Sequence, residues 1–136
     1  MNRSDFQELS ELHLQHAKAL LEVRLYSGAY YMCGYVVECA LKACICKRIN
    51  QYEFYPKEAQ KAWSQKFKDL ISLAEVAEKI KDDRRVDETL NIHWKVAEGW
   101  SVESRYERPL RREAEDLFAA VSHTVHGVLA CIKRYW

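Results

Sequence analysis

The sequence predicts an all-α fold, an up-and-down bundle of about five helices in a single domain over residues 1–136. Glycine occurs only four times and proline twice, while long segments are rich in Ala, Leu, Glu, Lys, Arg and Gln, which favour helices. No segment shows the alternation of polar and apolar residues that is typical of a strand. With 49% hydrophobic residues, a chain of 136 residues can bury one sizeable core.

The first part of the chain predicts an antiparallel helical hairpin. Apolar residues recur at helical spacing after Ser4, a suitable N-cap, so we expect a helix over residues 4–26. Ser27 and Gly28 interrupt this pattern, and a second helix is expected over residues 29–50. Because the interruption is short, the two helices should pack side by side in opposite directions.

The second predicted helix is apolar almost all the way round, and residues 29–46 carry only two charges, Glu38 and Lys42. These two share a stripe with Gly34 and Tyr35, whereas the opposite face consists mostly of small residues that would let another helix or a second copy approach closely. An exposed Glu-Lys pair four residues apart contributes only ~0.3 to 0.5 kcal/mol. Charge within so apolar a helix therefore indicates another role, and it argues against a membrane-spanning segment.

Charge and cysteine usage predict a soluble, cytoplasmic protein. The 21 basic and 20 acidic residues give a formal net charge of +1, so no global field would hold the chain on nucleic acid or on an anionic membrane. Any nucleic-acid contact must therefore be local. The N-terminal residues lack the apolar stretch of a signal peptide. All five cysteines fall inside predicted helices, which favours reduced, buried thiols.

The second part of the chain predicts shorter helices followed by one long helix. Pro56 can open a short helix, and the charged run 79–85 is interpreted as a solvated turn or a helix start. Residues 99–109 form the longest non-periodic segment, where we expect functional residues. Pro109 then opens a final helix with a continuous apolar stripe. The expected helices cover residues 57–64, 67–78, 86–97 and 109–136.

Four arginines crowd the start of the final predicted helix, where the positive end of the helix dipole disfavours cations by ~0.3 to 1 kcal/mol each. In one interpretation they pair at the surface with Glu103 and Glu107. In the other, their guanidinium groups and the free backbone N–H groups bind a phosphate or a carboxylate. Trp100 and Tyr106 add aromatic faces that can stack on a base, although tryptophan in a helix connection also commonly plugs the core. The arginines are Arg105, Arg108, Arg111 and Arg112.

No cofactor or metal site is predicted. His13 and His16 are spaced three residues apart, as are His123 and His126, but neither pair has further ligands beside it and the chain contains no Glu-x-x-His. We interpret the first pair as core residues on the inward stripe of their helix and His123 as solvent-facing. The sequence contains no Gly-rich phosphate loop and no Gly-x-Ser-x-Gly elbow, which excludes nucleotide or hydrolase chemistry by those folds.

Two passages, residues 26–43 and 100–107, resemble the HEPN superfamily of helical nucleotide-binding domains. The first contains Gly-Tyr-x-x-Glu-x-x-Leu-Lys-Ala and the second Trp-x-x-Glu-x-Arg-Tyr. The resemblance implies a helical bundle that commonly dimerises, found in prokaryotic toxin-antitoxin and defence systems and often beside a nucleotidyltransferase. Many members are metal-independent RNases that use an Arg followed by four to six residues and a His. Here seven residues separate Arg85 from His93, and no other pair meets the spacing.

The positions that match the two motifs form the candidate site. We expect Arg105 and Tyr106 to fold back onto the stripe of Glu38 and Lys42, where Gly34 leaves room, and so to compensate the buried charge. Such a cluster would either fix how the connection docks on the second helix or bind a ligand. The matching positions are Glu38, Lys42, Trp100, Glu103, Arg105 and Tyr106.

The expected function is that of a binding or regulatory module associated with a nucleotide or RNA, without independent enzymatic activity. The expected partners are a second copy of the chain and a nucleotidyltransferase. One alternative is a metal-independent endoribonuclease with a non-standard active site. Without an imidazole beside the arginine, however, general acid-base assistance worth ~10²- to 10⁴-fold is missing. The other alternative is a purely structural bundle that assembles with another helical protein.

Overall fold

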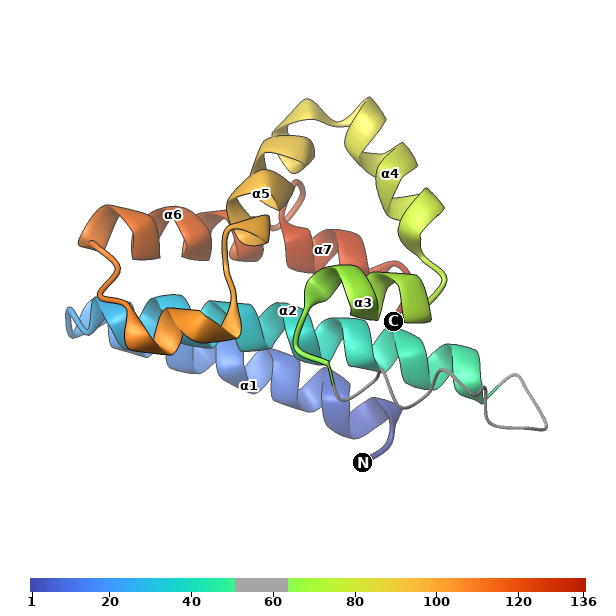
Figure 1. Ribbon diagram of the computed structural model, residues 1–136, viewed down its shortest axis with the longest axis horizontal. Helices are drawn as coiled ribbons and strands as arrows, with labels where there is room; N and C mark the ends of the chain where they lie inside the picture. Colours follow the sequence, from blue (N-terminus) through green and yellow to red (C-terminus); the bar gives the residue numbers. More distant parts are fainter. Residues whose placement is uncertain (51–63) are drawn as a thin grey trace.

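The computed structural model describes residues 1–50 and 64–136 and confirms an all-α helical bundle (Figure 1). These residues contain seven α-helices, one 3₁₀ helix and no strand, so the helices outnumber the prediction. The expected helix over residues 57–64 falls almost wholly outside the described residues. The elements are α1 (Arg3–Glu22), α2 (Tyr26–Ile49), α3 (Phe67–Leu73), α4 (Ala77–Val86), α5 (Glu88–Glu98), η2 (Val102–Tyr106), α6 (Arg111–Ser122) and α7 (Val128–Lys133).

Helices α1 and α2 form the expected antiparallel hairpin (Figure 1). The N-cap of α1 is Asn2 rather than Ser4, because Asn2 and Asp5 satisfy each other's backbone N–H groups at 2.8 and 3.0 Å. The turn falls at residues 23–25, where Arg24 adopts a left-handed conformation with φ of 63°. The predicted interruption was therefore a few residues late, and Gly28 lies inside α2.

Helix α2 is the centre of the core and packs against α1, α3, α6 and α7. Its small-residue face is fully buried within the chain, so this face is not available to a second copy, contrary to one expectation. By length and apolar composition alone, α2 could cross a membrane, but the core helix of a soluble protein has the same two properties. Of the most apolar 18-residue stretch of α2, 67% is buried inside the protein. The small-residue face comprises Ala29, Cys33, Val36, Ala40 and Ala43.

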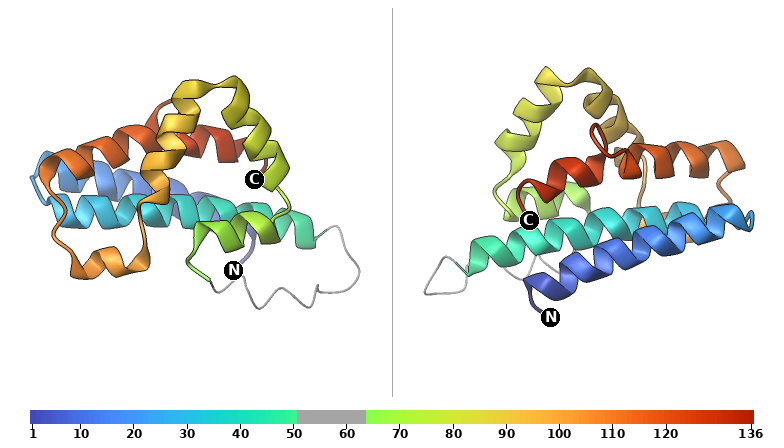
Figure 2. Two further views of the ribbon diagram at one scale, coloured as in Figure 1. Left: turned by 45° about the horizontal axis from the view of Figure 1, so that its top comes forward. Right: turned by 180° about the vertical axis from the view of Figure 1, so that it is seen from behind.

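Helices α4 and α5 form an arch that stands on the side of α2 away from α1 (Figures 1 and 2). The charged run 79–85 is part of α4, because Ile80 is buried and Asp83 accepts hydrogen bonds from Cys131 of α7 and from Tyr135 just after it. Helix α5 begins at Asp87, whose side chain accepts the Leu90 N–H at 3.0 Å. The run is thus an amphipathic helix rather than a solvated turn.

The predicted final helix is broken into α6 and α7, which lie along α2 in the same direction as that helix (Figure 2). Pro109 precedes α6, and Glu113 accepts the Leu110 N–H at 3.0 Å. At residues 123–127 the chain leaves the helical path, and Val125, expected on the apolar stripe, is 61% exposed. The apolar pattern continues across the break because α6 and α7 bury the same side, so periodicity alone did not reveal it.

Candidate functional site

The two motif passages meet where Trp100 crosses α2. Trp100 follows the end of α5 and is 5% exposed. It lies directly over Gly34, where a Cβ atom would collide with the indole ring. On its other side the ring stacks on Phe67 of α3, with centroids 5.4 Å apart and an interplanar angle of 5°. Gly34 thus leaves room as expected, but for Trp100, which plugs the core.

Two tyrosines of α2 extend this aromatic contact toward the surface. The hydroxyl oxygens of Tyr31 and Tyr35 are 2.7 Å apart, and their rings pack edge to face at 4.9 Å. Both rings also contact Trp100, at 5.8 and 6.0 Å. Burial and the hydrogen bond with Tyr31 raise the pKa of Tyr35 to about 12, so this phenol stays protonated at neutral pH. We call Tyr31, Tyr35 and Trp100 the aromatic cluster.

Helix η2 places Arg105 beside the aromatic cluster but outside the core. Ser104 is the residue of η2 that is buried, and its hydroxyl accepts the Ser101 N–H at 3.2 Å. The next two side chains therefore point outward: Arg105 is exposed and stacks over the ring of Tyr106 at 4.8 Å, and Tyr106 is 77% exposed. Electrostatic interaction with Tyr106, and more weakly with Tyr31, raises the pKa of Arg105.

Glu38 is compensated by Lys42 of its own helix and not by Arg105, contrary to the expectation. The Lys42 ammonium lies 2.7 Å from Oε1 of Glu38, and the two side chains are 15% and 7% exposed. The other carboxylate oxygen, Oε2, is buried and has no hydrogen-bond partner among the described residues. Because Arg105 is turned to solvent by η2, it forms no ion pair with Glu38. One oxygen of a buried acid is therefore left to accept a further donor.

Helix α1 contributes two imidazoles, His13 and His16, and the first of them contacts the aromatic cluster. The ring of His13 lies 5.9 Å from Tyr35 and 5.8 Å from His16, and its Nδ1 is buried without a partner among the described residues. Burial, and secondarily the nearby His16, lower the pKa of His13. His16 is exposed, so it does not belong to the core as predicted. The sequence did not predict that His13 of α1 and Arg105 of η2 would lie near the same tyrosine, Tyr35, because α1 and η2 are far apart in the chain.

The predicted arginine cluster divides into paired and unpaired members. Arg111 and Arg112 form i,i+4 ion pairs along α6, with Glu115 at 2.7 Å and with Asp116 at 3.8 Å. These two arginines therefore pair at the surface, but with acids of their own helix and not with Glu103 and Glu107 as expected. Arg105 and Arg108 are exposed and form no ion pair among the described residues.

A cavity of about 700 Å³ opens between α3 and the chain that leads into η2. Phe67, Trp94 and Trp100 supply aromatic walls, a composition and size that are typical of small-molecule sites. Glu103 at this cavity interacts electrostatically with both Lys66 and Arg105, and hydrogen bonds from its own backbone N–H and from Ser101 lower its pKa. Lys66 and Arg105 thus both lie near the carboxylate of Glu103.

The described residues offer no assembled metal site, since no group of three or more His, Cys, Asp or Glu side chains among them is placed to hold an ion. The cysteines are also poorly suited to nucleophilic chemistry, because burial raises the pKa of Cys33 and of Cys44 to about 12.

In comparisons with known proteins, the chain matches no family model, no curated protein and no solved structure. The resemblance to the HEPN superfamily therefore depends on the two motifs and on the order of the helices. In the structure, the motif residues lie around one face, where Trp100 contacts Gly34 and Arg105 lies close to Tyr31 and Tyr35.

Proposed function

We propose that this chain is a HEPN-like binding module that holds a phosphate-bearing ligand, a nucleotide or RNA, at the exposed surface around Arg105. The observation that carries the proposal is the pairing state of Arg105: its guanidinium group is exposed, forms no ion pair among the described residues and stacks on Tyr106. A guanidinium group in this setting can bind a phosphate through two parallel hydrogen bonds, while the tyrosine ring stacks on a base.

The neighbouring cavity gives the base a second place to bind. Its aromatic walls can take a planar ring, and Lys66 at its edge, close to the Glu103 carboxylate, can contact a phosphate group. Arg108 extends the positive surface beyond η2, so a longer RNA strand would contact more than one arginine.

Binding of labelled single-stranded RNA and of ATP, measured by fluorescence anisotropy over a range of salt concentrations, tests this proposal. We expect affinity to fall as salt rises, and Arg105→Ala and Arg108→Ala each to weaken binding about tenfold, because each removes a phosphate contact. Arg112→Ala is the matched control, since this exposed arginine has Asp116 as its partner on α6. Binding that is insensitive to salt, or an equal loss in Arg112→Ala, would contradict the proposal.

The biological setting follows from the resemblance and is part of the same proposal. A HEPN-like module would be cytoplasmic and prokaryotic, would act in a toxin-antitoxin or defence system, and would form a homodimer that pairs with a nucleotidyltransferase. Co-expression with a nucleotidyltransferase encoded beside it, followed by size-exclusion chromatography, tests the pairing. Elution of the two proteins in separate peaks at micromolar concentrations would exclude the nucleotidyltransferase as a partner.

Metal-independent RNA cleavage is a second candidate, favoured by the position of His13 and His16. His13 contacts Tyr35, which also interacts with Arg105, and His16 lies beside His13, so two imidazoles lie near an arginine that forms no ion pair among the described residues, despite the missing motif. We would then expect cleavage in the presence of EDTA, with a loss of about 100-fold or more in His13→Ala, His16→Ala or Arg105→Ala. Intact RNA after incubation with the wild-type protein, or cleavage that survives Arg105→Ala, would exclude this function.

A further inference from the structure

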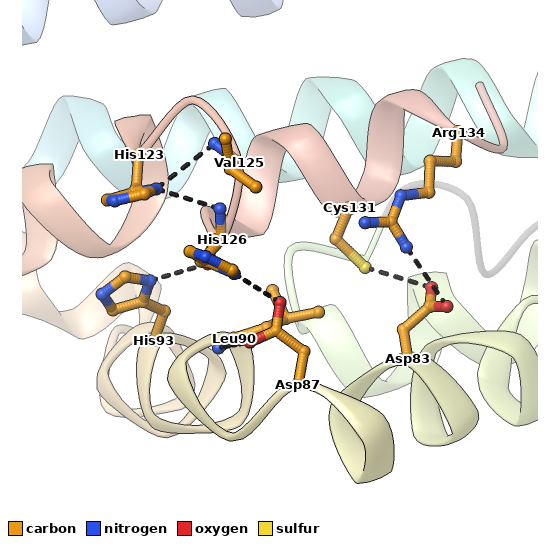
Figure 3. A network of polar contacts seen from close by, with 9 residues as sticks. All are labelled: Asp83, Asp87, Leu90, His93, His123, Val125, His126, Cys131 and Arg134. Carbon is orange, nitrogen blue, oxygen red and sulfur yellow. Dashed lines mark hydrogen bonds and ion pairs between the residues drawn. The ribbon is translucent and has the colours of Figure 1, made fainter.

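The break between α6 and α7 is built around three histidines that the proposed function does not use. Figure 3 shows His123 and His126 in the break, residues 123–127, facing His93 on α5. The ring centroid of His123 lies 5.7 Å from that of His93 and 5.2 Å from that of His126. We call residues 123–127 the elbow. It is held by the side chain of His123, which turns back onto the chain that follows it.

The hydrogen bonds of the elbow determine where each imidazole carries its proton. Nδ1 of His123 accepts the backbone N–H groups of Val125 and His126, at 3.2 and 2.9 Å, so this nitrogen must be unprotonated. Nδ1 of His93 lies 2.7 Å from the backbone oxygen of His126, and a carbonyl oxygen can only accept, so this nitrogen carries hydrogen. His123 is therefore held in the opposite tautomer to His93.

Protonation has opposite consequences at the two histidines of the elbow. Nδ1 of His126 lies 2.6 Å from a carboxylate oxygen of Asp87, so a positive charge on His126 strengthens this contact. A proton on Nδ1 of His123 removes the acceptor of two backbone N–H groups and sets an N–H against them. Of these two histidines, only His123 therefore loses contacts that hold the elbow closed when it is protonated. The stabilisation that these two hydrogen bonds provide is lost as pH falls.

We propose that the elbow is a pH-sensitive hinge, in which protonation of His123 releases the turn that joins α6 to α7. The groups that face His123 are His93 from α5 and His126 from the elbow, and charge on either imidazole would repel a charged His123 and assist the opening. Histidine is the side chain that changes charge near physiological pH.

Asp87, the acid that contacts His126, affects stability only at a lower pH. The hydrogen bond with His126 lowers the pKa of Asp87 below its ordinary value, and the Leu90 N–H and Arg134 act in the same direction. A carboxyl with a lowered pKa stabilises the fold above its ordinary pKa and loses this effect only in stronger acid. Asp83 on α4 forms an ion pair with Arg134 just after α7 (Figure 3) and accepts a hydrogen bond from the Tyr135 hydroxyl, so these contacts tie the end of α7 to α4 when the elbow opens.

Amide hydrogen exchange of the elbow, corrected for its intrinsic pH dependence, tests the hinge. Between about pH 7.5 and about pH 5.5, we expect protection of the Val125 and His126 amides to fall about tenfold in the wild type. His123→Asn keeps a neutral acceptor at the same position, so its protection should change less than about twofold. His16→Asn, the same change at an exposed site on α1, should retain the wild-type pH response. Unchanged wild-type protection, or an equal fall in His123→Asn, would overturn the proposal.

Ring-nitrogen NMR of the wild-type protein tests the same proposal without any variant. At neutral pH, the hydrogen of His123 should be on Nε2, whereas His93 and His126 should carry theirs on Nδ1. A hydrogen on Nδ1 of His123 at neutral pH would show that the imidazole does not accept the two amides, and the hinge would be rejected even if His123→Asn failed to fold.

Discussion

At the scale of single residues, the contact between Gly34 and Trp100 determines how η2 docks on α2. The indole ring occupies the space that any side chain at position 34 would need, and it is held on its other face by Phe67. Trp100 in turn sets the start of η2, and η2 exposes Arg105. Because Gly34 has a hydrogen atom where alanine has a methyl group, Trp100 can pack against α2 and so position the surface to which we assign ligand binding.

Replacement of Gly34 by alanine tests this contact. We expect Gly34→Ala to lower the free energy of unfolding by about 2 kcal/mol, because displacement of a buried tryptophan outweighs the ~1 kcal/mol that alanine gains in a helix. Gly28→Ala is the control on the same helix, since its Cβ would meet only Leu20, at 3.3 Å, and it should be neutral or stabilising. Urea denaturation followed by tryptophan fluorescence measures both, and equal stabilities of the two variants would contradict the prediction.

The pair of Glu38 and Lys42 shows why a buried charge needs its partner. Lys42→Met would leave the carboxylate of Glu38 buried without a counter-ion, and we expect a loss of roughly 3 kcal/mol in the free energy of unfolding. The double variant Glu38→Gln/Lys42→Met removes both charges and should recover at least half of that loss. Chemical denaturation of the four proteins of this cycle checks the coupling, which would be refuted by simple addition of the single effects.

At the scale of helices, local capping and turn chemistry moved several boundaries away from their predicted positions. The charged run 79–85 is helical because one of its faces packs on the core through Ile80, which composition did not reveal. The last helix breaks although its apolar stripe is continuous, because His123 replaces helical hydrogen bonds with contacts from its own side chain. These side-chain contacts decide boundaries that hydrophobic periodicity leaves open.

Gly127 is required for the break between α6 and α7. A Cβ atom at this position would collide with the backbone of His123, so Gly127→Ala should lower the free energy of unfolding by about 2 kcal/mol and loosen the elbow. Gly99→Ala, at the end of α5, is the control, because its nearest contact would be an ordinary 3.4 Å and its effect should stay within about 0.5 kcal/mol. Thermal unfolding of Gly127→Ala and Gly99→Ala measures the difference. Equal melting temperatures of the two variants would contradict the requirement for glycine at position 127.

At the scale of the whole molecule, the burial of α2 limits how a homodimer could form. The small-residue face of α2 is covered within the chain, so we consider a second surface for a homodimer, the outer face of the predicted final helix, whose first part is α6. That face carries Arg111 and Arg112 together with their acidic partners. Charges of both signs arranged in this way can pair with their own copy across a twofold axis.

We predict a homodimer at micromolar concentrations whose stability falls as salt rises, because charged groups would make much of its interface. Sedimentation equilibrium at low and high salt measures this directly. Arg111→Glu/Arg112→Glu should shift the protein toward monomer, whereas Lys18→Glu, an exposed charge reversal on α1, should not. A wild-type protein that sediments as a monomer at micromolar concentrations in low salt would reject the dimer.

The sequence by itself determined the all-α class, the hairpin of α1 and α2, the central position of α2 and the room left at Gly34, because composition, apolar periodicity and residue size act locally. Only the tertiary structure decided that Trp100 occupies that room, that Lys42 rather than Arg105 pairs with Glu38, and that His13 joins Tyr35. These outcomes depend on how helices pack and on how a short 3₁₀ turn directs its side chains. Neither property is encoded in the spacing of residues along one segment.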